Sequence, residues 1–285
     1  MAAGEALLFT PIRIGSLELP ARLFKTATAE TRASADGFVT DELVEFYRLI
    51  ALGGTPMIIT GNIYVSRQGK SAPRQVGADA DEKIVGLARI PEVVHACGGR
   101  IFAQLNHCGR QVVPDFVGAT DVVSASAVED LLTGTQPRAM RAAEIAAIVE
   151  QFGEAARRCK EAGFDGVQMH SANGYLMSQF LTPYTNRRDD EYGGALEQRT
   201  RFAREVLGAI RRRVGADFPV IMKMNGADAL PLRDGLAPPE LAEAARIMEA
   251  AGVDAIEISV GHYESGFPMV RGTFDRCLRN MLQGS

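Results

Sequence analysis

The sequence predicts an α/β fold built on parallel strands, either a (β/α)8 barrel or an open doubly wound sheet. Short continuous apolar runs alternate with longer segments of helical periodicity, which indicates buried parallel strands covered by helices. No Gly-x-Gly-x-x-Gly pattern follows the first of these runs, and this disfavours the dinucleotide-binding form of the open sheet. A length of 285 residues suits one large domain of either kind.

The N-terminal half contains a hairpin followed by three strand–helix units. Residues 7–19 predict two short strands around Gly15 and Ser16. Thr40 predicts a helix cap, because a threonine hydroxyl can accept a bond from the first turn and Asp41 follows it. The expected strands are residues 22–27, 55–63 and 99–106, and the expected helices are residues 40–52 and 81–96, the second broken at Pro91.

The C-terminal half continues the alternation. Residues 142–162 form the clearest helix, because Ile145, Ile148 and Phe152 recur at three- and four-residue steps. Gly163 then provides a C-terminal stop. The further expected strands are residues 166–169, 219–225 and 253–260, and the further expected helices are residues 196–213 and 239–251. Together they give six strand–helix alternations, of which the last is incomplete.

Composition excludes several classes of protein. With 46% hydrophobic and 23% charged residues, a net charge of -4 and a pI of about 5.7, the chain has no basic footprint for nucleic acid or an anionic membrane. No segment is long and apolar enough for a signal peptide or a membrane span. The four cysteines form no CxxC pair, so we expect no metal site and no disulfide frame, and a cytoplasmic location.

A histidine, an amide and a phenol follow the predicted strand at residues 166–169. If the next residues form a helical turn, His170 and Asn173 share one face. Two donors that converge on one point suit a carbonyl oxygen or an anion, and Tyr175 can then give or take a proton.

Other polar residues follow the remaining strands, and in a barrel all these ends meet at one mouth. His107 is equally compatible with bracing its loop and with a functional role, and residues 120–138 form either a lid or a mobile connection. His262 and Tyr263 lie either in a substrate pocket or in a solvated loop. The strand-end candidates are Thr26, Ala27, Thr28, Gly61, Gln104, His107, Lys223, Asn225, His262 and Tyr263.

Residues 164–202 resemble the Old Yellow Enzyme family of FMN-dependent ene-reductases, and the resemblance extends over residues 8–279. Gln198 is a departure, since the family more often has Asn there. The matching motif residues are His170, Asn173, Gly174, Tyr175, Gln179, Phe180, Leu181, Thr185, Asn186, Arg188, Tyr192, Gly193, Gly194 and Arg199.

The resemblance implies an FMN-binding (β/α)8 TIM barrel with the hairpin as a plug beneath it. It places the backbone of Thr26, Ala27 and Thr28 beside the flavin ring and implies that Gly61 lets the ring approach. It also implies that Gln104 binds the pyrimidine edge and that Lys223 lies near flavin N1 and the C2 carbonyl, where a cation favours reduction.

The resemblance also implies a reaction. NADH or NADPH reduces FMN, which then passes hydride to the activated C=C bond of an α,β-unsaturated carbonyl compound. His170 and Asn173 would hold the carbonyl oxygen, Tyr175 would protonate the α-carbon, and His262 would line the substrate pocket. Ala29 stands where many relatives have Thr or Cys near the flavin, so we expect an altered redox potential.

The chain is expected to form one incomplete FMN-binding domain, residues 1–285, because strands seven and eight cannot be found. We expect a fragment of a longer protein that binds FMN poorly; completion by a partner chain and a different closure are the alternatives. Homo-oligomer assembly is left open. Lys223 is also compatible with an interior lysine paired to a carboxylate or with the imine-forming amine of an aldolase, and an inactive barrel fragment is a third functional class.

Overall fold

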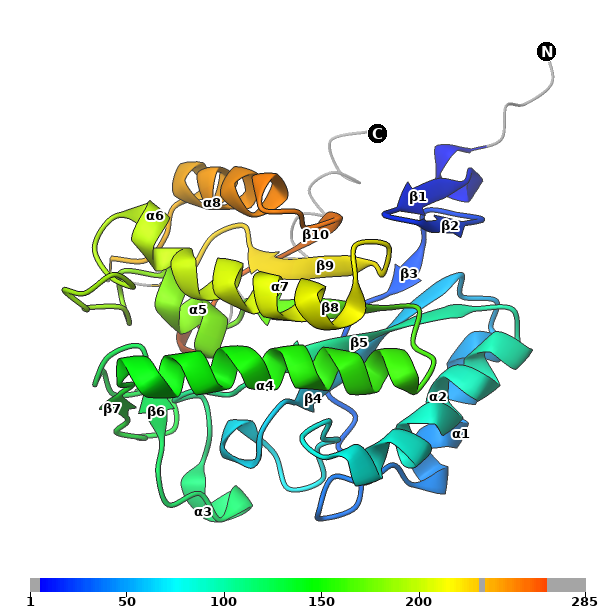
Figure 1. Cartoon of the computed structure of the whole chain (residues 1–285), viewed down its shortest axis with the longest axis horizontal. Coiled ribbons are helices and arrows are strands. Elements are labelled where there is room, and N and C mark those ends of the chain that lie inside the picture. The colour runs from blue at the N-terminus through cyan, green and yellow to red at the C-terminus, as the bar shows by residue number, and fades with distance from the viewer. Residues whose placement is uncertain (1–5, 231–233, 266–285) are drawn as a thin grey trace, which may run out of the picture.

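The computed structural model describes residues 6–230 and 234–265, and within them six parallel strands form one curved sheet (Figure 1). The strand order is β10-β9-β8-β5-β4-β3, so each strand–helix unit adds its strand beside the previous one. This confirms the predicted parallel α/β fold and its six strands. They are β3 (Phe24–Lys25), β4 (Met57–Tyr64), β5 (Arg100–Asn106), β8 (Gly166–Ser171), β9 (Val220–Asn225) and β10 (Ala255–Ser259).

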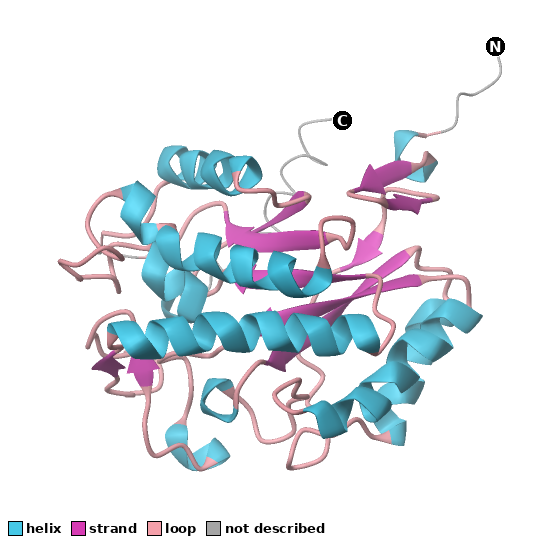
Figure 2. Ribbon diagram, in the orientation of Figure 1, coloured by secondary structure: helices cyan, strands magenta, loops and turns pink. Residues whose placement is uncertain are grey.

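The long helices cover the outer face of the sheet, and α4 packs against α7 (Figure 2). They are α1 (Asp41–Leu52), α2 (Ile84–Ala96), α4 (Ala142–Glu161), α7 (Arg201–Val214) and α8 (Pro238–Ala250). The predicted caps are confirmed: Leu43 N donates to Thr40 Oγ1 at 3.3 Å, and Gly163 follows α4 with a φ of 91°. None of the helices in the described part of the chain has the length and apolarity needed to cross a bilayer.

The N-terminal hairpin closes one end of the sheet. Strands β1 (Ile12–Ile14) and β2 (Leu17–Leu19) pair antiparallel, and Leu19 is buried in a cluster with Met57, Phe102 and Ile221. These three residues lie in the first half of β4, β5 and β9, so the hairpin covers the N-terminal end of the sheet, as predicted. Residues before β1 form the 3-10 helix η1 (Leu7–Phe9) instead of the predicted strand.

Two helix predictions were wrong in detail. Helix α2 continues through Pro91, which is buried with Leu87, Ile90 and Val94, so the packing of this face outweighs the one backbone bond that proline removes. The predicted helix over residues 196–213 is two helices, α6 (Leu196–Arg199) and α7, which meet at Thr200.

Short elements that the sequence pattern did not predict surround the C-terminal end of the sheet. Each is too short to show a hydrophobic period in the sequence, so the pattern of apolar residues does not reveal it. They are η2 (Arg67–Gly69), η3 (Asp81–Lys83), α3 (Pro114–Val117), β6 (Val123–Ser124), β7 (Arg138–Ala139), α5 (Leu176–Leu181) and η4 (Tyr263–Ser265).

The apolar stripe of α4 belongs to the main core, and this gives a stability prediction. Phe152 is fully buried, so Phe152→Ala should lower the free energy of unfolding by about 3–5 kcal/mol. Phe116→Ala is the matched control, because Phe116 is 69% exposed and should change it by less than about 0.5 kcal/mol. Urea denaturation measures both, and equal midpoints for the two variants would contradict the assignment of Phe152 to the core.

Candidate active site

The C-terminal end of β8 delivers His170 and then makes a sharp turn to Tyr175. Asn173 and Gly174 have φ values of 60° and 90°, so residues 171–175 form no helical turn and the prediction of a shared helical face was wrong. Gly174 is required at this turn, because a Cβ there would lie 3.0 Å from His262 Nδ1 on a backbone that favours glycine. Helix α5 begins directly after Tyr175, its N-cap residue.

His170 is a buried neutral imidazole beside the Tyr175 ring. The two ring centroids are 4.7 Å apart in an edge-to-face arrangement. Burial, and to a lesser degree the charge of Lys223, lower the pKa of His170 to about 3, so the ring is uncharged at neutral pH. Ala172 N donates to its Nδ1 at 3.4 Å, which leaves the proton on Nε2. His170 therefore offers one N–H donor.

Asn173 does not direct its amide to the same point. Its Nδ2 donates to Ser259 Oγ at 3.4 Å and to the Gly261 carbonyl at 3.3 Å. Its backbone N donates to Asn225 Oδ1 at 3.1 Å. In this structure Asn173 therefore joins the ends of β8, β9 and β10, while His170 contacts Tyr175.

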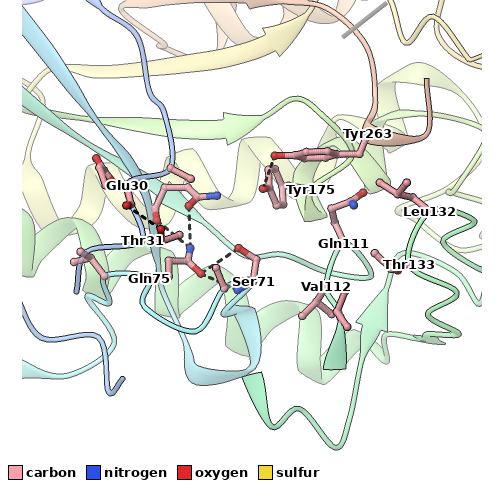
Figure 3. A pocket seen from close by; sticks show the side chains of 15 residues that line it. Glu30, Thr31, Ser71, Gln75, Gln111, Val112, Leu132, Thr133, Tyr175 and Tyr263 are labelled. Carbon is pink, nitrogen blue, oxygen red and sulfur yellow. Dashed lines mark hydrogen bonds between the residues drawn. The ribbon is translucent and has the colours of Figure 1, made fainter. Parts of the chain in front are cut away.

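Tyr175 and Tyr263 form a pair of phenols at the wall of a cavity of about 300 Å³ (Figure 3). Their hydroxyl oxygens are 3.1 Å apart and their rings meet edge to face. Burial first, and then the neighbouring Tyr263, raise the pKa of Tyr175 well above its usual value, and a hydrogen bond with Asn62 opposes this less strongly. The Tyr175 hydroxyl therefore keeps its proton throughout the physiological range.

The cavity is lined by Asn62 of β4 and by residues from the loops after β3, β4, β5, β8 and β10. His262, predicted in the pocket wall, is not among the lining residues; it is fully buried with its Nε2 3.3 Å from Asp228 Oδ1. Its neighbour Tyr263 occupies the wall. The lining residues are Ala29, Glu30, Thr31, Asn62, Ser71, Ala72, Gln75, Val76, Gln111, Val112, Val113, Leu132, Thr133, Tyr175 and Tyr263.

The segment predicted as either a lid or a mobile connection contributes Leu132 and Thr133 to that wall. A buried ion pair holds it there, since Arg110 Nη2 lies 2.6 Å from Glu264 Oε2. The other Glu264 oxygen accepts from Leu131 N at 2.7 Å, and Arg110 also donates to the Val128 carbonyl at 3.2 Å. One ion pair thus fixes both this segment and the turn that carries Tyr263.

Lys223 lies inside the sheet, and its Nζ is 3.0 Å from Glu257 Oε1 on the neighbouring strand β10. An interior lysine paired to a carboxylate was one of the alternatives that the sequence allowed for Lys223. Gln104 is buried on β5, and its backbone N donates to Thr60 Oγ1 at 3.0 Å. Neither residue lines the cavity. Gln104 and Lys223 therefore lie apart from the part of the cavity wall that Tyr175 forms.

The predicted residues on the first two strands lie at the open side of the mouth. Thr26 and Thr28 are exposed and Ala27 is half-buried, directly after β3. Gly61 stands where the register of β4 against β5 shifts, and its N donates to Glu30 Oε1 at 2.6 Å. Burial raises the pKa of the Glu30 carboxyl.

His107 braces its own loop, because its Nδ1 accepts from Gly109 N at 3.1 Å. The ring is fully buried, and burial lowers its pKa to about 3. His107 and His170 thus both enter the folded state uncharged.

These two histidines predict a loss of stability in mild acid. Their pKa in the folded state is about 3 against 6.5 for the free side chain, so the unfolded chain takes up protons first as the pH falls. Their contribution to the free energy of unfolding is complete above pH 6.5. It is lost progressively towards pH 3, by at most about 1.4 kcal/mol per pH unit for each histidine. Urea unfolding from pH 7.5 to 5 measures this slope, and His107→Gln should reduce it; an unchanged slope would contradict the assignment.

Most of the motif residues that carry the resemblance hold the loop after β8 in place. Gln179 Nε2 donates to the carbonyls of Cys108 and Gly174, and Asn186 Nδ2 donates to those of Phe180 and Tyr192. Arg188 pairs with Asp190 within the same loop. The long match in sequence is therefore largely a match of scaffolding around His170 and Tyr175.

Two carboxylates at the mouth were missed. Glu257 could have been found from the sequence, because it is a charged residue inside the mostly apolar strand AIEIS, as Lys223 is inside VIMKMN. Glu30 had none, since it lies in a loop where carboxylates are common. Among the described residues, no group of three or more His, Cys, Asp or Glu side chains could hold a metal ion.

Comparison with known proteins gives extensive matches. A family model described as the NADH:flavin oxidoreductase / NADH oxidase family matches residues 7–280. The chain is 38% identical over 259 residues to an NADH oxidase of Thermoanaerobacter brockii, which covers 90% of this chain and 40% of that protein. It is 33% identical over 258 residues to an NADPH dehydrogenase of Geobacillus sp. (strain WCH70), which covers 90% and 74%.

Solved structures agree. The chain matches a 2-naphthoyl-CoA reductase with a TM-score of 0.87 at 30% identity, covering 91% of this chain and 41% of that one. It matches an old yellow enzyme homologue from Zymomonas mobilis with a TM-score of 0.79 at 30% identity, covering 90% and 74%. The chain thus spans about two-fifths of the length of several relatives. These matches confirm the predicted barrel type, of which the described residues contain six strands.

Proposed function

Because this chain belongs to the NADH:flavin oxidoreductase / NADH oxidase family, we propose that it reduces the C=C bond of an α,β-unsaturated carbonyl compound with FMN and NADH or NADPH. The observation that supports this best is the contact between a neutral imidazole, that of His170, and the protonated phenol of Tyr175; Tyr175 lines the cavity, and His170 lies behind it. His170 and Tyr175 are 4.7 Å apart between ring centroids, and both are buried.

The residues at the mouth fit a flavin. A Cβ at Gly61 would lie 2.0 Å from Glu30 Oε2 and 2.6 Å from the Thr28 carbonyl, so this position requires glycine, and the Glu30 carboxylate occupies the space beside it. Gln104 and Lys223 supply an amide and an ammonium, which suit the carbonyls and N–H of a flavin and the negative charge of its reduced form. FMN, when bound, would supply the hydride chemistry between nicotinamide and alkene. The backbone of residues 26–28 would flank it.

In this proposal His170 Nε2–H donates to the substrate carbonyl oxygen and stabilises the negative charge that develops there. Tyr175 gives its proton to the α-carbon, and its high pKa guarantees that the proton is present. Tyr263, at 3.1 Å, orients the Tyr175 hydroxyl. Asn173 would join His170 only by giving up its bonds to Ser259 and Gly261, so we assign the oxygen contact to His170 first.

The proposal is tested by an anaerobic titration of the chain with FMN in excess. NADH or NADPH should bleach the absorbance of the bound flavin, and 2-cyclohexenone should then restore it with formation of cyclohexanone. Bleaching without restoration by any enone or enal would contradict alkene reduction.

We do not propose an imine-forming lyase. Lys223 is paired with Glu257 at 3.0 Å and does not line the cavity, so its amine is not presented to a carbonyl substrate. Borohydride in the presence of a carbonyl substrate should therefore leave the mass of the chain unchanged.

A further inference from the structure

A continuous row of polar side chains crosses the interior of the sheet. Gln104 Nε2 on β5 donates to Gln168 Oε1 on β8 at 2.7 Å. Gln168 Nε2 donates to Glu257 Oε2 on β10 at 2.7 Å, and the other Glu257 oxygen lies 3.0 Å from Lys223 Nζ on β9. Gln168 is fully buried, Gln104 is 2% exposed, and the side chains of Lys223 and Glu257 are about 10% and 9% exposed.

The carboxylate dictates the direction of every bond in this row. An ionised carboxylate can only accept, so Gln168 must turn its amide nitrogen towards Glu257. The Gln168 oxygen then faces Gln104 and can only accept, so Gln104 must donate its Nε2. Within the described part of the chain no hydrogen bond uses Gln104 Oε1, which is therefore available as an acceptor at the mouth.

The same carboxylate also holds the cation. Lys223 and Glu257 are direct partners in the β9–β10 register. Lys25 is a second cation nearby, and it lies close enough for the charges of Lys223 and Glu257 to influence its pKa. Removing one member of a buried pair leaves the other charge uncompensated, which is more costly than removing both. The position of the Lys223 ammonium thus depends on Glu257.

We propose that Glu257 is a positioning residue for the flavin: it sets the amide direction of Gln104 through Gln168 and holds the Lys223 ammonium. The inference rests on the proposed function, because an acceptor oxygen and an ammonium are what the N–H and carbonyls of a flavin pyrimidine ring require. Glu257 acts through these two residues without touching the ring itself.

Three variants separate the two tasks. Glu257→Gln has one acceptor oxygen where the carboxylate has two, and the Lys223 ammonium takes it, so the new NH2 group faces Gln168 and reverses the direction of the row. Gln168→Leu interrupts the row and leaves the Glu257–Lys223 pair intact. Glu257→Leu removes both, and Glu249→Leu on the exposed surface of α8 is the matched control. Circular dichroism establishes which variants fold.

Binding is measured on the full chain with lumiflavin, which carries the ring without the ribityl phosphate, by quenching of its fluorescence. Relative to the unmodified chain and Glu249→Leu, we expect the dissociation constant to rise about tenfold or more in each of the three variants, and most in Glu257→Leu. Equal binding by folded Gln168→Leu and the unmodified chain would overturn the inference alone. No binding of lumiflavin to the unmodified chain would overturn the proposed function and the inference together.

A second readout needs no flavin. The side-chain NH2 groups of Gln104 and Gln168 should exchange slowly with solvent in ¹⁵N spectra of the unmodified chain and of Glu249→Leu. In Gln168→Leu the Gln104 signals should exchange quickly. Slow exchange of Gln104 in that variant would show that the row does not orient it.

Discussion

Tyr175→Phe is expected to lower the rate of alkene reduction by about 10²- to 10⁴-fold, the usual contribution of a positioned general acid. The substitution keeps the ring that packs on His170 at 4.7 Å and removes only the hydroxyl that lies 3.1 Å from Tyr263. Because burial raises the pKa of this phenol, it is protonated before the reaction, so its loss should affect the step that needs a proton and leave flavin reduction by NADPH unchanged.

Stopped-flow absorbance of the FMN-saturated chain measures the two steps separately. Tyr192→Phe is the matched control, because its hydroxyl bonds to Glu205 at 2.9 Å and it does not line the cavity. A Tyr175→Phe variant that reoxidises with 2-cyclohexenone as fast as Tyr192→Phe would remove Tyr175 from the proposed mechanism.

The sequence predicted the scaffold well because each strand and long helix has its own pattern. The apolar runs that became β4, β5, β8 and β9 are buried on both faces, so their composition alone marks them. Pro91 shows the limit of local reasoning. Its cost to the helix is local, whereas the burial of Leu87 and Val94 that offsets it comes from neighbouring elements.

The site could be predicted only as a set of residues at one mouth. His170 and Tyr175 meet because they flank one short turn. Asn173 lies between them in sequence, yet its amide is directed by the Gly261 carbonyl, 88 residues further on. The pairing of Lys223 with Glu257 likewise depends on the register between two strands, which the sequence of either strand does not contain.

His170→Leu tests the other half of the mechanism. Leucine fills a buried site but donates no hydrogen bond, so the rate of alkene reduction should fall by about 10²- to 10³-fold, as for the loss of one oxyanion donor. His170→Asn keeps a donor and should recover part of this loss. Because burial lowers the pKa of His170 to about 3, the imidazole should donate as a neutral group, and the rate should show no ionisation of His170 between pH 5 and 8. A limb near pH 6.5 that disappears in His170→Asn would instead indicate a charged imidazole and contradict the buried neutral donor.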